Sequence, residues 1–165
     1  MLKKVGLFRQ IIKYAVIILG IVLIVEGYVH YPYVKSVITG KVFIPKSSEC
    51  SMYYRYYLRD SETQEEHLRD VKVDGEYLSR IVELLDAQEL TFDILSDNDS
   101  NAYMEKIFFK TWYGQRITLW TCIDGYTYLE NGLYCLPSCK TWEIQKILEK
   151  ESGYMDFDNE ILIGP

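Results

Sequence analysis

The longest hydrophobic pattern in the sequence is an uncharged run near the N-terminus, YAVIILGIVLIV at residues 14–25. Basic residues precede this run, namely Lys3, Lys4, Arg9 and Lys13, and Glu26 follows it. As a helix, residues 11–31 span about 31 Å, which is sufficient to cross the hydrocarbon core of a bilayer. The pattern therefore predicts a transmembrane helix at 11–31, after a basic segment at 1–10.

This helix is expected to be an uncleaved signal anchor that contacts membrane lipid. Signal peptidase sites carry small residues in an A-x-A-like arrangement, and the best candidate here, Val25-Glu26-Gly27, matches poorly. Cleavage followed by secretion is the main alternative, and burial of the segment inside a soluble protein is another. The excess of Lys and Arg before the helix places the N-terminus in the cytoplasm and the C-terminal domain outside it.

Residues 32–48 are predicted to form a stalk. They contain Pro32, Gly40 and Pro45, and proline discourages a continuing helix because it lacks a backbone donor. An extracytoplasmic domain is then expected at 49–152. A tail at 153–165 mixes acidic and apolar residues, so the pattern does not decide between docking and disorder.

Within the domain, apolar residues mostly alternate with polar ones, which is the period of a β-strand. The predicted strands are 50–58, 71–73, 90–95, 105–113, 116–123, 126–129 and 133–136. Asp-Gly at 124–125 and Asn-Gly at 131–132 supply the positive φ of tight hairpin turns. The last four strands are therefore expected to form an antiparallel meander. Polar loops are predicted at 59–67 and 96–102.

Two segments show the spacing of a helix. Asp74 can cap a helix at 75–88 with an apolar stripe formed by Leu78, Ile81, Val82 and Leu85. Ser138 or Thr141 can cap a second helix that ends near residue 151. The predicted fold class is α+β: a single transmembrane helix, then a small antiparallel sheet covered by two helices.

Charge is distributed unevenly along the chain. Residues 1–46 hold seven Lys or Arg against one Glu, whereas residues 47–165 hold 11 Lys or Arg against 23 Asp or Glu. An acidic domain argues against nucleic acid as a partner, because phosphate binding needs a basic footprint. The same balance predicts that the domain does not lie flat on anionic lipid.

Four cysteines, at positions 50, 122, 135 and 139, all fall in the predicted domain. Outside the cytoplasm an even number permits two disulfides, with three pairings open, and buried free thiols are the alternative. The spacing of Cys135 and Cys139 is not the C-x2-C of a zinc ribbon or redox pair.

Candidate chemistry in the sequence is sparse. Asp97, Asp99 and Asn101 resemble the opening of a calcium loop, but Ala102 and Phe108 stand where an EF-hand needs Gly and Glu. The titratable residues Glu65, Glu66, His67 and Asp70 are typical of an exposed loop. No nucleophile, phosphate-binding or metalloprotease motif is present. No cofactor, metal or catalytic role is therefore predicted.

The surplus of aromatic residues is the remaining feature. The chain has 15 Tyr and three Trp, and exposed aromatics mark partner surfaces. The residues expected to form such a surface are Trp112, Trp120, Tyr126 and Tyr128. These patterns predict a membrane-anchored, non-enzymatic module that binds a protein, peptide or envelope component. An envelope enzyme that uses scattered carboxylates and a small accessory subunit of a membrane complex are the alternatives.

Overall fold

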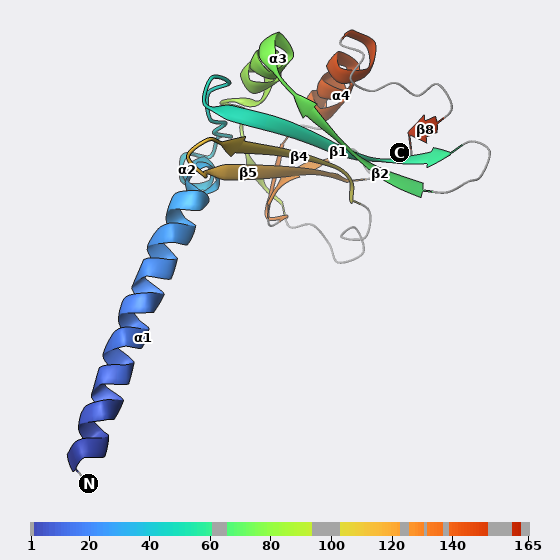
Figure 1. Cartoon of the computed structure of the whole chain (residues 1–165). Helices are drawn as coiled ribbons and strands as arrows, with labels where there is room; N and C mark the ends of the chain where they lie inside the picture. Colours follow the sequence, from blue (N-terminus) through green and yellow to red (C-terminus); the bar gives the residue numbers. More distant parts are fainter. Residues whose placement is uncertain are drawn as a thin grey trace.

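A computed structural model describes residues 2–60, 66–93, 103–122, 126–130, 132–136, 139–151 and 160–162. The chain begins with the long helix α1 (Leu2–Val29), which projects from a compact α+β domain (Figure 1). Among the described residues, one helical segment, Gln10–Val29, is long and apolar enough to cross a membrane. Its side chains make no buried contact with the domain, which agrees with the predicted hydrophobic segment.

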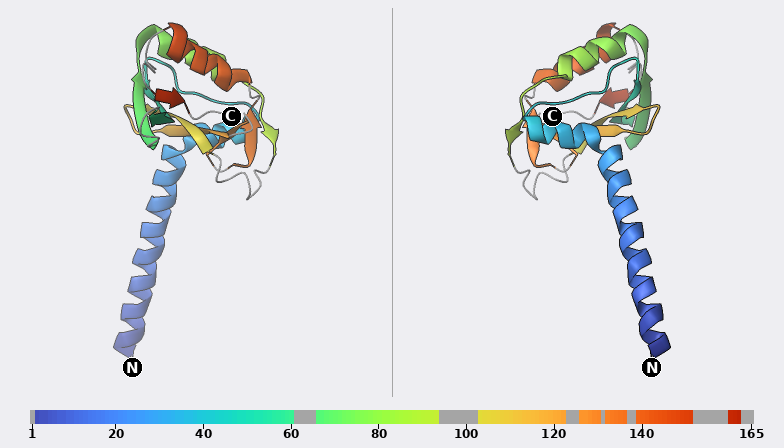
Figure 2. Two further views of the ribbon diagram at one scale, coloured as in Figure 1. Left: turned by 90° about the vertical axis from the view of Figure 1, so that its right-hand side faces the viewer. Right: turned by 90° about the vertical axis from the view of Figure 1, so that its left-hand side faces the viewer.

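The predicted stalk at 32–48 is wrong. Residues Tyr31–Thr39 form a second helix, α2, which turns sharply from α1 and lies along the domain (Figure 2). Pro32 occupies the first turn of α2, where its missing N–H costs nothing, so this proline begins a helix and does not break one. Gly40 ends α2 in the left-handed conformation, which glycine adopts without strain.

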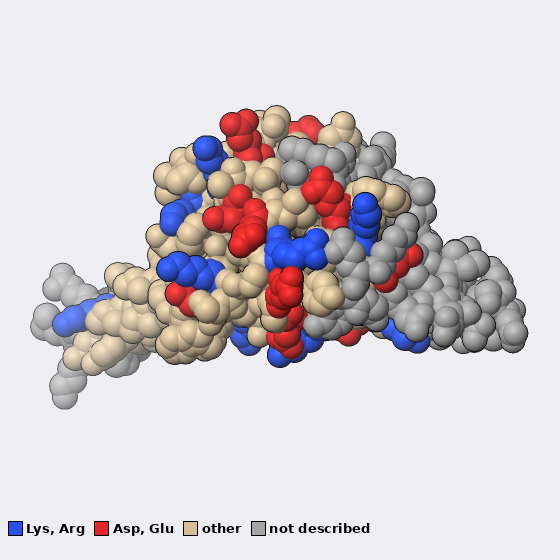
Figure 3. All heavy atoms as spheres, turned by 90° about the horizontal axis from the view of Figure 1, so that it is seen from above, with Lys and Arg blue, Asp and Glu red and all other residues tan. Residues whose placement is uncertain are grey.

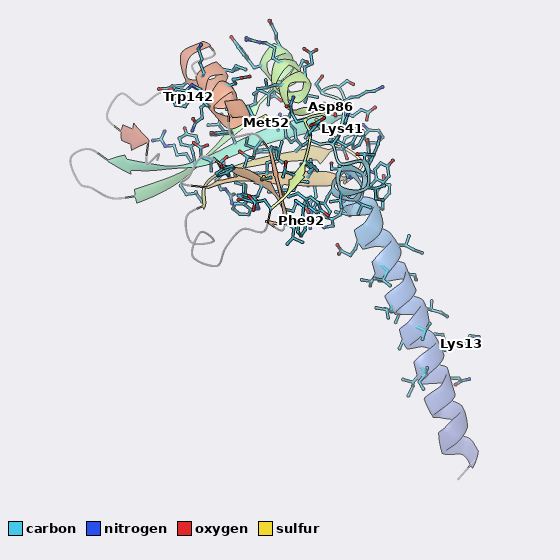
Figure 4. The ribbon with its side chains drawn as sticks, turned by 180° about the vertical axis from the view of Figure 1, so that it is seen from behind. Lys13, Lys41, Met52, Asp86, Phe92 and Trp142 are labelled. Carbon is cyan, nitrogen blue, oxygen red and sulfur yellow. The ribbon has the colours of Figure 1, made fainter. Side chains whose placement is uncertain are left out.

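The segment after α2 belongs to the core. Val42 and Ile44 are almost completely buried, and the backbone of residues 40–42 pairs with that of 87–90. The Asp86 carboxylate accepts a hydrogen bond from the backbone N–H of Ile44 at 3.2 Å, near the point where the chain enters the domain (Figure 4). The domain therefore begins with α2, because the buried side chains of Val42 and Ile44 attach the segment that follows α2 to the core.

Seven antiparallel strands form one open sheet in the order β2-β1-β4-β5-β6-β7-β3, and β8 pairs with the far end of β1. The strands are β1 (Cys50–Asp60), β2 (Glu66–Val73), β3 (Thr91–Phe92), β4 (Tyr103–Thr111), β5 (Arg116–Cys122), β6 (Thr127–Leu129), β7 (Tyr134–Leu136) and β8 (Glu160–Leu162). The predicted meander of four strands is confirmed as β4 to β7. Strands β1 and β2 extend into the predicted loop at 59–67, and β8 brings part of the predicted tail into the sheet.

Two helices cover one face of the sheet, α3 (Gly75–Leu85) and α4 (Cys139–Lys146), and a π-turn, η2 (Ile147–Glu151), continues the second (Figure 2). The apolar stripe of α3 and Ile144 and Leu148 face inward strand residues such as Met52 and Phe109. Figure 4 shows Met52 between the sheet and the helices. This arrangement confirms the α+β class. Asp74 occupies the predicted N-cap position but makes no capping hydrogen bond, because its carboxylate pairs with Lys72.

Candidate functional site: a basic face of the sheet

Strand alternation gives the sheet a second face with a different character. Because successive side chains point to opposite sides, the neighbours of the core residues on β1, β4 and β5 all lie on the face opposite α3 and α4. Four of them are cations: Arg55, Lys106, Lys110 and Arg116. We call these four residues, together with Tyr53, Phe108 and Trp120, the basic face.

The four cations form two cross-strand pairs of like charge. Arg55 on β1 is directly opposite Lys106 on β4, and Lys110 on β4 is directly opposite Arg116 on β5. Like charges in this position destabilise a sheet. The two pairs therefore do not contribute to the stability of the fold. A bound anion would reduce the repulsion between the cations of each pair.

Aromatic rings separate the two pairs of cations. The rings of Tyr53 and Phe108 stack across β1 and β4, with centroids 4.9 Å apart and planes 10° apart. The Lys106 ammonium lies 4.3 Å from the ring centroid of Trp120, which is the geometry of a cation–π contact. The rings hold the flexible cations near one another, and such preorganisation favours binding.

The basic face, apart from Tyr53, lines an open hollow of about 770 Å³ that ends at α1 and at His30. His30 Nδ1 lies 2.9 Å from Glu130 Oε2, and the Arg116 guanidinium lies 3.1 Å from His30 Nε2. The second oxygen of Glu130 accepts a hydrogen bond from the backbone N–H of Thr118. The hollow is therefore built against the end of α1, although the contributing residues are far apart in the chain.

Three of the four cations have no carboxylate partner among the described residues. Asp70 on β2 forms a bidentate pair with Arg55, at 2.6 and 2.7 Å, whereas no ion pair involves Lys106, Lys110 or Arg116 in that part of the chain. The hydrogen bonds from Arg55 lower the pKa of Asp70. Partial burial, together with the charges of Arg55 and Arg116, lowers the pKa of Lys106, as expected where positive charges crowd.

The opposite side of the domain carries charges of both signs. Seen from the side of α3 and α4, acidic and basic side chains intermingle (Figure 3). The two helices and the π-turn carry five acidic residues against four basic ones, namely Glu76, Glu83, Glu143, Glu149 and Glu151 against Arg80, Lys140, Lys146 and Lys150. These elements are nearly balanced in charge, so they do not account for the net acidity of residues 47–165, and that net acidity does not describe the basic face either. The expectations that the domain does not bind nucleic acid and does not lie flat on anionic lipid rest on a net charge that is not uniform over its surface, and they stay predictions.

The predicted aromatic surface is not one patch. Trp112 lies at the tip of the β4–β5 hairpin and is 83% exposed, and Tyr126 is also exposed. Trp120 lies in the basic face, whereas Tyr128 keeps only 4% of its surface and cannot present its ring to a partner. Trp142 is exposed on α4, on the far side from the basic face (Figure 4). The alternation of side chains along a strand assigns Trp112 and Trp120 to the face opposite the core. It does not reveal whether another element covers a residue, as happens for Tyr128.

The hairpin tip is tied to the end of α1. The Tyr28 hydroxyl donates to the carbonyl of Tyr113 at 3.4 Å, and the Tyr113 hydroxyl donates to Glu49 at 3.0 Å. The backbone N–H of Trp112 also donates to the carbonyl of Glu49. These contacts hold the exposed indole of Trp112 beside the last turn of α1.

A buried polar cluster lies on the core side of the same strands. The amide of Gln145 on α4 donates to Glu105, and Thr121 is the cross-strand neighbour of Glu105. Burial raises the pKa of Glu105, although the nearby Tyr54 hydroxyl and Gln145 amide partly oppose the rise. Tyr54 Oη, Glu105 Oε2 and Thr121 Oγ1 are buried without a hydrogen bond of ordinary geometry.

Cys50 and Cys135 carry free thiols. Burial and the nearby Glu49 raise the pKa of Cys50 to about 11, and burial and Asp93 raise that of Cys135. The side chains of Cys122 and Cys139 lie outside the described residues. Because Cys50 and Cys135 are free, the one disulfide that does not involve either of them joins Cys122 to Cys139. That disulfide stays a prediction.

The calcium-loop residues Asp97, Asp99 and Asn101 lie outside the described residues, as do Glu65 and the side chains of Glu66 and His67. Asp70, the remaining member of the predicted titratable cluster, pairs with Arg55. Across the described ranges, no group of three or more His, Cys, Asp or Glu is placed to hold a metal ion.

No protein-family model, curated protein or solved structure matches this chain. Function must therefore be argued from the residues of the basic face and from their position beside α1.

Proposed function

We propose that the chain is a single-pass membrane protein, with a short cytoplasmic N-terminus and its domain on the extracytoplasmic side. The support is the apolar, solvent-exposed segment Gln10–Val29 and the excess of basic residues before it. The weak match of Val25-Glu26-Gly27 to a cleavage site favours an uncleaved anchor over a secreted product.

We further propose that the domain is a binding module and not an enzyme, and that its basic face binds an anionic protein, peptide or envelope component. The observation that carries this proposal is the placement of two like-charge cross-strand pairs, Arg55–Lys106 and Lys110–Arg116, around a row of aromatic rings. Such pairs cost stability in the free protein. A bound anion offsets this cost, because it converts repulsion among the cations into attraction.

The geometry also fits a planar or extended anion better than a small ion. The cations lie on neighbouring strands about 5 Å apart, in a hollow of about 770 Å³. An arginine fork and an ammonium side by side suit phosphate or carboxylate oxygens. The ring of Phe108, which stacks on Tyr53, offers an apolar floor between the charges.

Inorganic tripolyphosphate is a suitable probe, titrated calorimetrically into the full-length chain in nanodiscs of neutral lipid. Replacing both Lys106 and Lys110 with Gln should weaken binding at least tenfold, because the loss of even one charge-assisted contact is worth about 1.5–3 kcal/mol. Lys146→Gln, on the opposite side of the domain, is the matched control and should bind like the wild type. Equal affinities for all three proteins, or no binding by any, would refute the basic face as a site for soluble polyanions.

Topology is tested separately by adding a protease to intact cells or spheroplasts that express the full chain. An extracytoplasmic domain is degraded and leaves a short membrane-bound fragment. Full protection of the domain reverses the proposed orientation, and release of an intact soluble domain without protease indicates cleavage of the N-terminal segment.

A further inference from the structure

Helix α2 carries an exposed apolar stripe directly after the membrane segment. Tyr31, Val34 and Ile38 are all exposed, and Ile38 is 79% exposed. Their spacing of three and four residues places them on one side of the helix. The other side of α2 is fixed to the domain, since Pro32 and Ser36 are buried and the Ser36 hydroxyl accepts from the backbone N–H of Phe43.

A helix of this kind is typical of a membrane interface. Amphipathic helices lie in the plane of the headgroups with their apolar side toward the acyl chains. Helix α2 starts two residues after α1 ends and turns away from its axis (Figure 2). With α1 in a bilayer, α2 is at the depth where the headgroups begin.

Trp112 is a second element at the same level. Its indole is 83% exposed at a hairpin tip that Tyr28 joins to the last turn of α1. Trp and Tyr concentrate at the membrane–water interface because their rings are apolar and their N–H or O–H is polar. Trp112, Tyr28 and Tyr31 therefore gather near one end of α1, as a belt of interfacial aromatics does.

The basic face is turned toward the same side. Helix α1 extends away from the domain on the side opposite α3 and α4 (Figures 1 and 2), and the basic face is the sheet face opposite those helices. The face that carries α3 and α4, where acidic and basic side chains intermingle, points the other way (Figure 3). The four cations of the basic face therefore lie on the side of the domain from which α1 extends, toward the bilayer.

We infer that the domain lies on the surface of its own membrane, held there by the stripe of α2 and by Trp112, and that the basic face binds the phosphates of anionic phospholipid headgroups. The inference rests on the proposed function, because it names the anion that this site takes. It also reverses the expectation from net charge, since only the side of the domain that faces the lipid matters for this contact.

The central test labels surface lysines of the full-length chain in nanodiscs with a membrane-impermeant acylating reagent, read by mass spectrometry. Nanodiscs of neutral phosphatidylcholine are compared with nanodiscs that also contain phosphatidylglycerol. We expect Lys106 and Lys110 to lose labelling in the anionic nanodiscs and to recover it at high salt, which screens headgroup charge. Lys146 is the internal control and should label equally in both.

A third sample, neutral nanodiscs with tripolyphosphate, separates the two proposals. Protection of Lys106 and Lys110 by both anionic lipid and tripolyphosphate supports both. Protection by tripolyphosphate alone overturns the lipid inference and leaves the proposed anion site standing. Protection by neither refutes both, and protection by lipid alone supports headgroup binding while refuting a site for soluble anions.

Depth of insertion is measured independently with brominated lipids, which quench nearby tryptophans. Trp112→Phe should remove most of the quenching, whereas Trp142→Phe on the far side should leave it unchanged. Both side chains are largely exposed, so both variants should fold. Equal quenching of the wild type and Trp112→Phe would show that the hairpin tip stands clear of the bilayer.

Discussion

Asp70 holds Arg55 in a bidentate ion pair across β1 and β2, with both N···O distances below 2.8 Å. Arg55 is thereby the one cation of the basic face with a carboxylate partner among the described residues. The pair therefore tunes the site, because Asp70 competes with any incoming anion for the same guanidinium.

Replacing Asp70 with Asn should tighten tripolyphosphate binding by severalfold while changing the free energy of unfolding by no more than about 1 kcal/mol, the range for exposed pairs. The side chains of Arg55 and Asp70 are 35% and 44% exposed, so solvent screens the lost attraction. Calorimetry and chemical denaturation measure the two effects. Glu76→Gln on α3 is the control, and weaker binding by Asp70→Asn would contradict the competition.

Glu105 should make the domain less stable as the pH rises. Its pKa is raised above the ordinary value of 4.5, so the folded state holds the proton more tightly than the unfolded state does. The contribution of Glu105 is therefore most favourable below pH 4.5 and declines as the pH rises toward its folded-state pKa.

Glu105→Gln should remove this decline and raise the free energy of unfolding at pH 7 by roughly 1 kcal/mol, because a buried charge becomes a neutral amide that still accepts from Gln145. Denaturation of both proteins at a series of pH values from 4.5 to 7 is the measurement. Two parallel stability curves would show that Glu105 does not titrate differently on folding.

The segment that resembles a stalk contains a matched pair for testing its role. Ile44 is 3% exposed and Ile38 is 79% exposed. Ile44→Ala should cost about 2–5 kcal/mol of stability, whereas Ile38→Ala should stay within about 0.5 kcal/mol. Thermal or chemical denaturation of the full chain in neutral nanodiscs measures both changes in stability. If Ile44→Ala had a negligible effect on stability, residues 32–48 would again be interpreted as a stalk.

Cys50 should react slowly with alkylating reagents. With a pKa of about 11, roughly one thiol in a thousand is ionised at pH 8, and the thiolate is the nucleophile. Iodoacetamide labelling of the native and the denatured chain, followed by peptide mass spectrometry, should show at least tenfold slower modification of Cys50 in the native chain, an order-of-magnitude expectation from thiolate control of reactivity. Equal rates would mean that Cys50 is neither buried nor held beside Glu49.

Local patterns predicted most of the elements. Alternation located β1, β4 and β5, and glycine located the hairpin turns, because both depend on neighbours in sequence. The role of residues 32–48 was mistaken, since nothing local distinguishes an apolar Val42 or Ile44 that packs on a distant helix from one in an extended linker.

The basic face was predictable in part and was missed. Lys106, Lys110 and Arg116 occupy the polar positions of strands whose register follows from a recognised hairpin, so their gathering on one face could have been derived. Summing charge over residues 47–165 concealed it. The contribution of Arg55 and of His30 depends on pairing between distant segments, which one sequence does not specify.

The junction between α1 and α2 leaves the domain little freedom to swing. His30 alone separates the two helices, its backbone continues the hydrogen bonding of both, and its ring contacts Glu130 and Arg116. A change in the tilt of α1 then changes the angle between the domain and the membrane surface by the same amount. A helix in a thinner bilayer tilts further, and such a tilt would press one edge of the sheet down and lift the other. The thickness of the membrane would thus set how fully the hollow meets the lipid, and the protein would respond to the bilayer as a mechanical environment as well as a chemical one.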